Sequence, residues 1–134
     1  MNKAILTGAG IIGAGVGIKG QIDAKKDDPY ASTESKHILA NGGIQAATYV
    51  GYAAGATKLI ESAITKKPPN LAAMGFAAGI GALEGYIAQK QGEAIDKNTD
   101  SSIGAYAKNM LRGSISGALI GVGVSGIASD IVFK

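Results

Sequence analysis

The chain has no cysteine, no tryptophan, two phenylalanines and only three prolines among its 134 residues. The missing cysteine excludes disulfide bonds and thiolate metal sites. Collagen and proline-rich disorder both need far more proline, so neither class describes this chain. The scarcity of large side chains matters most, because a soluble core gains about 1.5–3 kcal/mol from each large apolar side chain that it buries. The sequence therefore lacks the usual material of such a core.

Small residues take the place of the missing bulk. The chain has 21 glycines, and 46% of its residues are hydrophobic. Residues without bulk let helices approach each other at backbone distance, which is how helices pack in lipid. The net charge of +3 suits contact with anionic lipid or with nucleic acid.

Charged residues divide the chain into four apolar segments within a single domain, 1–134. The segments are 4–18, 38–57, 70–83 and 113–129. Crossing about 30 Å of hydrocarbon takes roughly 20 helical residues. Only the second segment reaches that length without a charge, so the others predict short tilted spans, shallow insertion or hairpins buried in an oligomer. The fold that we predict is all-α, with about four membrane-inserting helices arranged as glycine-zipper hairpins.

Two linkers indicate where the early helices end. Residues 20–36 have the composition of a loop, and the run 66–70 contains a proline pair that cannot continue a helix. Asn70 or a neighbouring proline then opens the third helix. Because this break is short, we expect the second and third segments to form a helical hairpin.

The longest polar stretch lies between the third and fourth segments. The third helix is expected to continue past Glu84 and to end before a turn near 98–102. Ser101 or Ser102 is expected to cap the fourth helix, because a serine hydroxyl there accepts a hydrogen bond from a free backbone N–H group.

Every apolar segment carries small residues at intervals of four, the pattern of a glycine zipper. Four-residue steps stay near one helix face, so the stripe forms a groove in which a second helix packs closely. Each interior glycine lowers helix stability in water by about 0.8–1 kcal/mol relative to alanine, and packing has to compensate for this loss. We expect helix packing and oligomerisation to use Gly13, Gly17, Gly51, Gly55, Gly75, Gly79, Gly81, Gly85, Gly113, Gly117, Gly121 and Ser125.

Two of these stripes share a short repeat. Gly-Tyr-Ala-Ala-Gly at 51–55 recurs as Gly-Phe-Ala-Ala-Gly at 75–79. Two copies of five residues are too few for a solenoid. The repeat is consistent with one packing solution used twice.

Candidate catalytic and ligand-binding features are weak. Residues 8–13 match the Gly-x-Gly-x-x-Gly dinucleotide fingerprint, but no second strand and no ribose-binding acid follow Ile18. His37 is the only histidine and has no partners at metal-ligand spacing. No Ser/His/Asp set or paired carboxylates can be defended. We therefore expect no enzyme activity, no catalytic residue, no cofactor and no metal.

The whole-chain pattern of small size, Gly/Ala-rich apolar helices and lysine-flanked ends resembles the small internal virion proteins of short-tailed bacteriophages. Those proteins are stored in the particle and ejected to form a conduit for DNA across the host envelope. The chain is similar, less closely, to phage holins, which open the inner membrane. The stretch 75–85, followed by 96–98 and 113–117, is loosely like the core of the mitochondrial inner-membrane translocase family, whose charge spacing it does not follow.

The first resemblance implies a homo-oligomeric, membrane-inserting pore or channel protein that contributes to a phage DNA-ejection conduit. The implied partners are further copies of the chain, a lipid bilayer, other virion or envelope proteins and, transiently and without sequence specificity, DNA. The implied location is the membrane of the bacterial host envelope, after storage in a virion. Two alternatives stay open: a structural packing protein inside a virion or large assembly that never meets lipid, and a holin-like membrane permeabiliser.

Overall fold

The computed structural model describes residues 2–27 and 34–132, and every regular element within them is an α-helix. The helices are α1 (Lys3–Asp27), α2 (Ser35–Thr65), α3 (Leu71–Ile95) and α4 (Ile103–Val132). Three of them are long and apolar enough to cross a membrane: α1 over Lys3–Ala24, α3 and α4. The predicted all-α fold of about four helices is confirmed.

The helices extend beyond the uncharged segments that predicted them. α1 continues past Ile18 to Asp27, so residues 20–27 are helical and their assignment to a loop was wrong. The rest of that predicted loop, 28–33, lies outside the described residues. Lysine, glutamine and alanine, which this stretch contains, are good helix formers, and the Lys19 ammonium pairs with the Asp23 carboxylate one turn later at 2.5 Å. Charges therefore end an apolar stretch without ending the helix.

This continuation reverses one expectation. The segment 38–57 was predicted to be the only one of membrane-spanning length, yet α2 is the helix that is not apolar enough to count among the three candidates. α1, α3 and α4 reach the required length because their flanking polar residues stay helical. A count of uncharged residues alone underestimated the lengths of these three helices. Charged residues at helix ends can belong to a span, since their side chains can reach the headgroup region.

Two predicted helix starts are confirmed. The Asn70 side chain accepts a hydrogen bond from the Ala73 backbone N–H at 3.0 Å and caps α3. The Ser102 hydroxyl accepts from the Ala105 backbone N–H at 3.2 Å and caps α4. α2 ends at Thr65, and its C-cap Lys66 has a left-handed φ of 56°, two residues before the proline pair begins.

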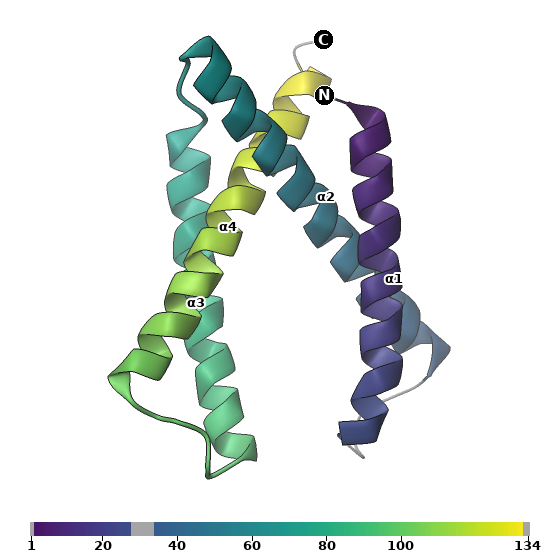
Figure 1. Ribbon diagram of the computed structural model, residues 1–134, viewed down its shortest axis with the longest axis vertical. Helices are drawn as coiled ribbons and strands as arrows, with labels where there is room; N and C mark the ends of the chain where they lie inside the picture. Colours follow the sequence, from purple (N-terminus) through teal and green to yellow (C-terminus); the bar gives the residue numbers. More distant parts are fainter. Residues whose placement is uncertain (1, 28–33, 133–134) are drawn as a thin grey trace.

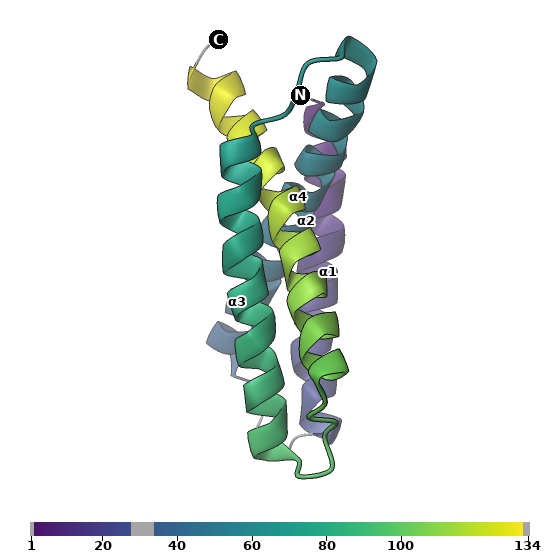
Figure 2. The same cartoon turned by 90° about the vertical axis from the view of Figure 1, so that its left-hand side faces the viewer.

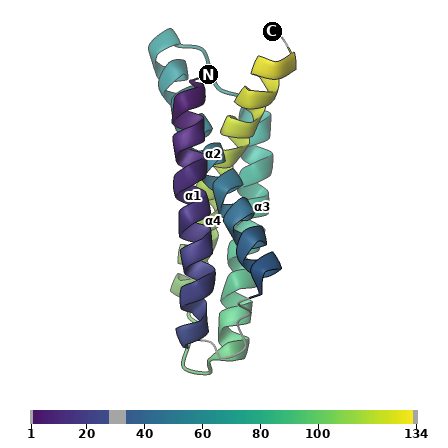
Figure 3. The ribbon, with the colours of Figure 1, turned by 90° about the vertical axis from the view of Figure 1, so that its right-hand side faces the viewer.

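The helices pair as two hairpins that meet at one crossing. α1 packs on α2, α3 packs on α4, and α2 crosses α4 (Figure 1). Figure 2 shows α3 and α4 side by side, and Figure 3 shows α1 lying against α2. The expected hairpin of the second and third segments is wrong, because α2 and α3 make no close backbone contact although they are consecutive. The α3 glycines that contact another helix of this chain, Gly81 and Gly85, contact α4.

The interior contains almost no bulk. Among the described residues, Ala54 and Val122 are the only buried apolar side chains, and no large side chain is fully buried. Ile11 is 68% exposed, and Phe76 is 75% exposed. Because glycines occupy the helix contacts, the backbones of facing helices lie close together and few side chains pack between them. The described part of the chain therefore does not form a core that would stabilise it alone in water.

Uncharged parts of the four helices lie at one level. Gly13 meets Gln45, Gly51 meets Ile120 and Gly117 meets Ala77, all within the uncharged segments. Along α4 the uncharged run 113–129 is about 24 Å long at 1.5 Å per residue. Charged residues flank this band at both ends of the molecule. The termini and the α2–α3 connection lie at one end, and the α3–α4 loop lies at the other (Figure 1).

Candidate helix-packing surface

The first glycine surface joins α1 to α2. A Cβ atom at Gly13 would clash with the backbone oxygen of Gln45, and one at Gly17 would clash with that of Asn41. The Asn41 side-chain amide donates a hydrogen bond to the Gly17 carbonyl oxygen at 2.9 Å. Gly42, which was not among the predicted residues, is buried opposite the Ile18 side chain at 3.0 Å from an ideal Cβ. Backbone contact and one amide thus hold this hairpin.

The second surface joins α3 to α4 and contains five of the predicted glycines. Gly81 and Gly113 face each other so closely that a Cβ on either would clash with the carbonyl oxygen of the other. Gly85, Gly117 and Gly121 each stand equally close to the backbone of the opposite helix. The predicted Ser125 accepts a hydrogen bond from the Asn70 side-chain amide at 2.9 Å. These residues form one continuous seam along the hairpin.

The third surface is the crossing of α2 over α4, which links the hairpins. Gly51 faces the Ile120 side chain at 3.3 Å from an ideal Cβ, and Gly55 lies directly against the Leu119 carbonyl oxygen. Gly123 is buried against the backbone of Gly51, although the search for steps of four did not find it. It is followed by Gly126 three residues later. A search at steps of three and four, which share a helix face, would have included both glycines.

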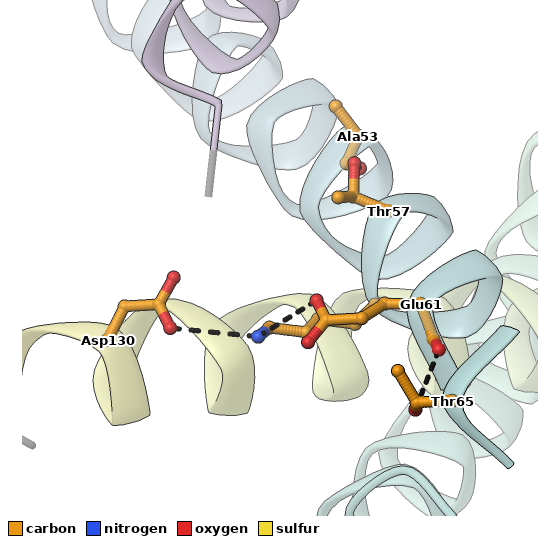
Figure 4. A network of polar contacts seen from close by, with 6 residues as sticks. Ala53, Thr57, Glu61, Thr65 and Asp130 are labelled. Atoms are coloured by element: carbon orange, nitrogen blue, oxygen red, sulfur yellow. Dashed lines mark hydrogen bonds and ion pairs between the residues drawn. The ribbon is translucent and has the colours of Figure 1, made fainter. Parts of the chain in front are cut away.

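Polar groups reinforce the same crossing. The hydroxyl groups of Tyr52 and Ser116 share a hydrogen bond between α2 and α4. The aliphatic part of Lys58 lies over Gly126, where an ideal Cβ would be 2.6 Å from the lysine side chain. Its ammonium group pairs with Glu61 at 3.4 Å and with Asp130 of α4 at 3.6 Å (Figure 4). Lys58 therefore ties α2 to α4 at the end that carries the termini.

Gly75 and Gly79 are the predicted residues that the structure does not bring to a helix. A Cβ at either glycine would meet nothing within 4 Å. The two copies of the short repeat thus differ in their surroundings: Gly51 and Gly55 lie under α4, while Gly75 and Gly79 stay uncovered. The exposed face carries large neighbours one turn away on each side, Leu71 and Leu83, which are 63% and 57% exposed.

A polar cluster stabilises the far end of the α3–α4 hairpin. Gln89 is the only buried polar residue in the described part of the chain, at 4% exposure. Its side-chain amide donates to the Asp100 carbonyl oxygen at 2.6 Å, and its side-chain oxygen accepts from the Asn109 amide. The Tyr106 hydroxyl donates to the Glu93 carboxylate at 2.8 Å. Each of these groups has a hydrogen-bond partner within the chain, so the cluster holds this end of the hairpin together.

The Asp100 carboxylate forms the turn that leads into α4. The Ser102 backbone N–H donates to it at 2.9 Å, and this hydrogen bond lowers the pKa of Asp100.

Within 2–27 and 34–132, no three His, Cys, Asp or Glu side chains gather as a metal site would require. Comparison with protein-family models, with curated proteins and with solved structures finds no match for this chain.

Proposed function

We propose that this protein inserts into a membrane as a homo-oligomer and forms a pore. The observation that carries the proposal is that large apolar side chains lie on the outside of the molecule and almost none lie inside. Ile11, Phe76 and Ile115 are more than 60% exposed, whereas buried apolar side chains are almost absent among the described residues. In water, exposing this apolar surface costs about 25 cal/mol of free energy for each Å². Lipid removes this penalty, and helices with small residues at their contacts are typical of lipid.

The charged residues support the same function. The charge-free band of about 24 Å is somewhat thinner than a hydrocarbon core of about 30 Å. Lys3 and Lys67 at one edge and Arg112 at the other have stems long enough to extend across the difference. Several polar groups inside the band are bonded within the chain: Tyr52 pairs with Ser116, and the Ser114 hydroxyl donates to the Ala78 carbonyl oxygen. A bilayer demands such internal satisfaction of polar groups.

Self-association uses the face of α3 that the monomer leaves uncovered. Leu71, Gly75, Gly79 and Leu83 follow one another at steps of four, so two open glycines lie between two exposed leucines. The related repeat at 51–55 shows how this chain covers such a face, because α4 lies on it at backbone distance. In the assembly a helix of a second copy covers Gly75 and Gly79. The pore then lies between copies.

The more specific role, a conduit for DNA ejected from a phage particle, rests on the resemblance of the whole-chain pattern to internal virion proteins. Membrane insertion and self-association rest on the geometry. Under this role the chain is stored in the virion and reaches the bacterial envelope with the ejected contents. The net charge of +3 favours passage of a polyanion.

Release of a trapped dye from liposomes tests the proposal. Wild-type protein is expected to cause leakage, and Gly75→Val/Gly79→Val is expected to reduce leakage at least about tenfold, because two branched side chains block a helix at backbone distance. Gly8→Val/Gly15→Val is the matched control, since these glycines also have nothing within 4 Å but lie on α1. It should leak like the wild type.

Three outcomes would contradict the proposal in different ways. Equal leakage of both double variants would refute the α3 interface while leaving insertion intact. A stable assembly without leakage would favour the structural packing protein. A monomer that stays soluble without detergent and never binds vesicles would refute membrane insertion.

A further inference from the structure

Beyond the crossing of α2 and α4, the face of α4 that contacts α2 continues without a partner. Leu119 packs on Gly55 at the crossing. Ile115, Arg112 and Lys108 precede Leu119 by four, seven and eleven residues, a spacing that puts them on the same side of the helix. Ile115 is 62% exposed. The contact face of α4 therefore becomes first apolar and then basic toward the α3–α4 loop.

The opposing face of α2 is also uncovered. Ala47 and Ile44 precede Gly51 by four and seven residues, and thus extend its α4-facing side. Ile44 is 62% exposed. The two hairpins diverge from the crossing toward the α3–α4 loop (Figure 1), and α1 makes no close backbone contact with α3 or α4. We call these two uncovered faces together the notch: Ile44 lies on its α2 face, Ile115 lies on its α4 face, and Arg112 and Lys108 continue the α4 face toward the α3–α4 loop.

At the basic end of the α4 face, the α3–α4 hairpin contains a cavity of about 400 Å³ that is lined by Lys108, Arg112 and Asn109 among others, all from α3, α4 and their loop. In the part of the chain that the structure describes, neither cation makes an ion pair, whereas Lys58 pairs with two carboxylates. Asp100, the acidic residue of the lining, already accepts a hydrogen bond from the Ser102 backbone N–H. The lining therefore presents two cations and one carboxylate, a net charge of +1, beside neutral polar side chains such as that of Asn109.

We propose that the notch binds one anionic phospholipid, with its phosphate at Lys108 and Arg112 and an acyl chain along Ile115 and Ile44. This inference rests on the proposed insertion into a membrane. Arg112 stands where the uncharged run of α4 begins, at the depth of lipid headgroups. A guanidinium group holds a phosphate through two parallel hydrogen bonds, and a neighbouring ammonium adds charge. A zwitterionic lipid brings its own cation to the site, so an anionic headgroup is preferred.

The absence of tryptophan makes a direct test possible. Ile115→Trp places the only tryptophan of the chain in the notch, and Ile12→Trp places one on the exposed face of α1, where Ile12 is 61% exposed. Each reporter is reconstituted in vesicles of phosphatidylcholine with a minor share of either brominated phosphatidylglycerol or brominated phosphatidylcholine. Bromine on the acyl chains quenches tryptophan at contact. Preference is the ratio of apparent affinities from the two quenching curves.

The Ile115→Trp reporter is expected to prefer phosphatidylglycerol about tenfold or more, at about 1 kcal/mol for each cation, and the Ile12→Trp reporter to show no comparable preference. Adding Lys108→Gln/Arg112→Gln should abolish the preference of the notch reporter. Lys66→Gln/Lys67→Gln removes the same charge at the opposite end and should preserve it.

Several results would overturn the inference. If both reporters are quenched without headgroup preference, the protein inserts but the notch does not select an anionic lipid. If low-millimolar inorganic phosphate abolishes the preference, the cations form a site for free anions. If Lys108→Gln/Arg112→Gln weakens binding of a DNA duplex and leaves the lipid preference intact, the cations serve nucleic acid. If neither reporter is quenched, insertion itself fails and the lipid site fails with it.

Discussion

At the residue scale, Gly15 and Gly17 stand two positions apart in α1 and have opposite surroundings. A Cβ at Gly15 meets nothing within 4 Å, whereas one at Gly17 clashes with the Asn41 carbonyl oxygen. Gly17→Ala is expected to destabilise the fold by about 1–3 kcal/mol, as overpacking usually does. Gly15→Ala is expected to stabilise it by up to about 1 kcal/mol, because alanine favours the helix. Thermal unfolding in detergent measures both, and equal stability of the two variants would refute the close approach of α1 to α2.

Asp100 gives a prediction about pH at the same scale. Its pKa is lowered by the Ser102 backbone N–H, so the charged carboxylate stabilises the folded state. This stabilisation is present above the ordinary pKa of aspartate, about 3.9, and is lost as pH falls through the lower folded-state value. Asp100→Asn should therefore melt below the wild type at pH 6, and the difference should shrink steadily as pH falls below the ordinary aspartate pKa. A difference that stays constant over this range would show that the charge is not involved.

At the element scale, the α3–α4 hairpin depends on the buried Gln89 and its partner Asn109. Asn109→Leu leaves the Gln89 side-chain oxygen without a donor and should destabilise the protein by about 1–3 kcal/mol. Gln89→Leu should have a similar effect, and the double variant should lose less than the sum of the two. The exposed Gln91→Leu on the same helix is the control. Additive losses would mean that the amides do not act as a pair.

The same hairpin shows which parts of the structure could be predicted from the sequence. Asn70 and Ser102 were identifiable as caps, because capping depends on residues adjacent in the chain. The pairing of the helices was not identifiable, since small residues (Gly, Ala and Ser) at steps of four occur on several faces of every helix. Gly75 and Gly81 fit the pattern equally well, yet Gly81 lies against α4 and Gly75 is open. The partner helix decides which stripe is buried, and the local sequence does not encode that choice.

At the scale of the whole molecule, the two hairpins imply a definite sidedness in a membrane. The termini lie at the same end as the α2–α3 connection, opposite the α3–α4 loop (Figure 1). This arrangement requires α2 to cross as well, although it is the helix that hydropathy leaves out. Its crossing is helped because several of its polar groups are bonded inside the chain: Asn41 donates to the Gly17 carbonyl oxygen, and the Thr57 hydroxyl donates to that of Ala53.

Since the chain has no cysteine, single cysteines report this sidedness without background. Asn2→Cys and Lys67→Cys should react alike with an impermeant thiol reagent in sealed vesicles of uniform orientation, and Lys36→Cys and Lys97→Cys should react in the opposite way. Detergent should make all four positions equal. If only the three apolar helices crossed, Lys67→Cys would react like Lys36→Cys and unlike Asn2→Cys. The reactivity of Lys67→Cys therefore shows whether α2, despite its low hydropathy, crosses the bilayer when it packs against α1 and α4.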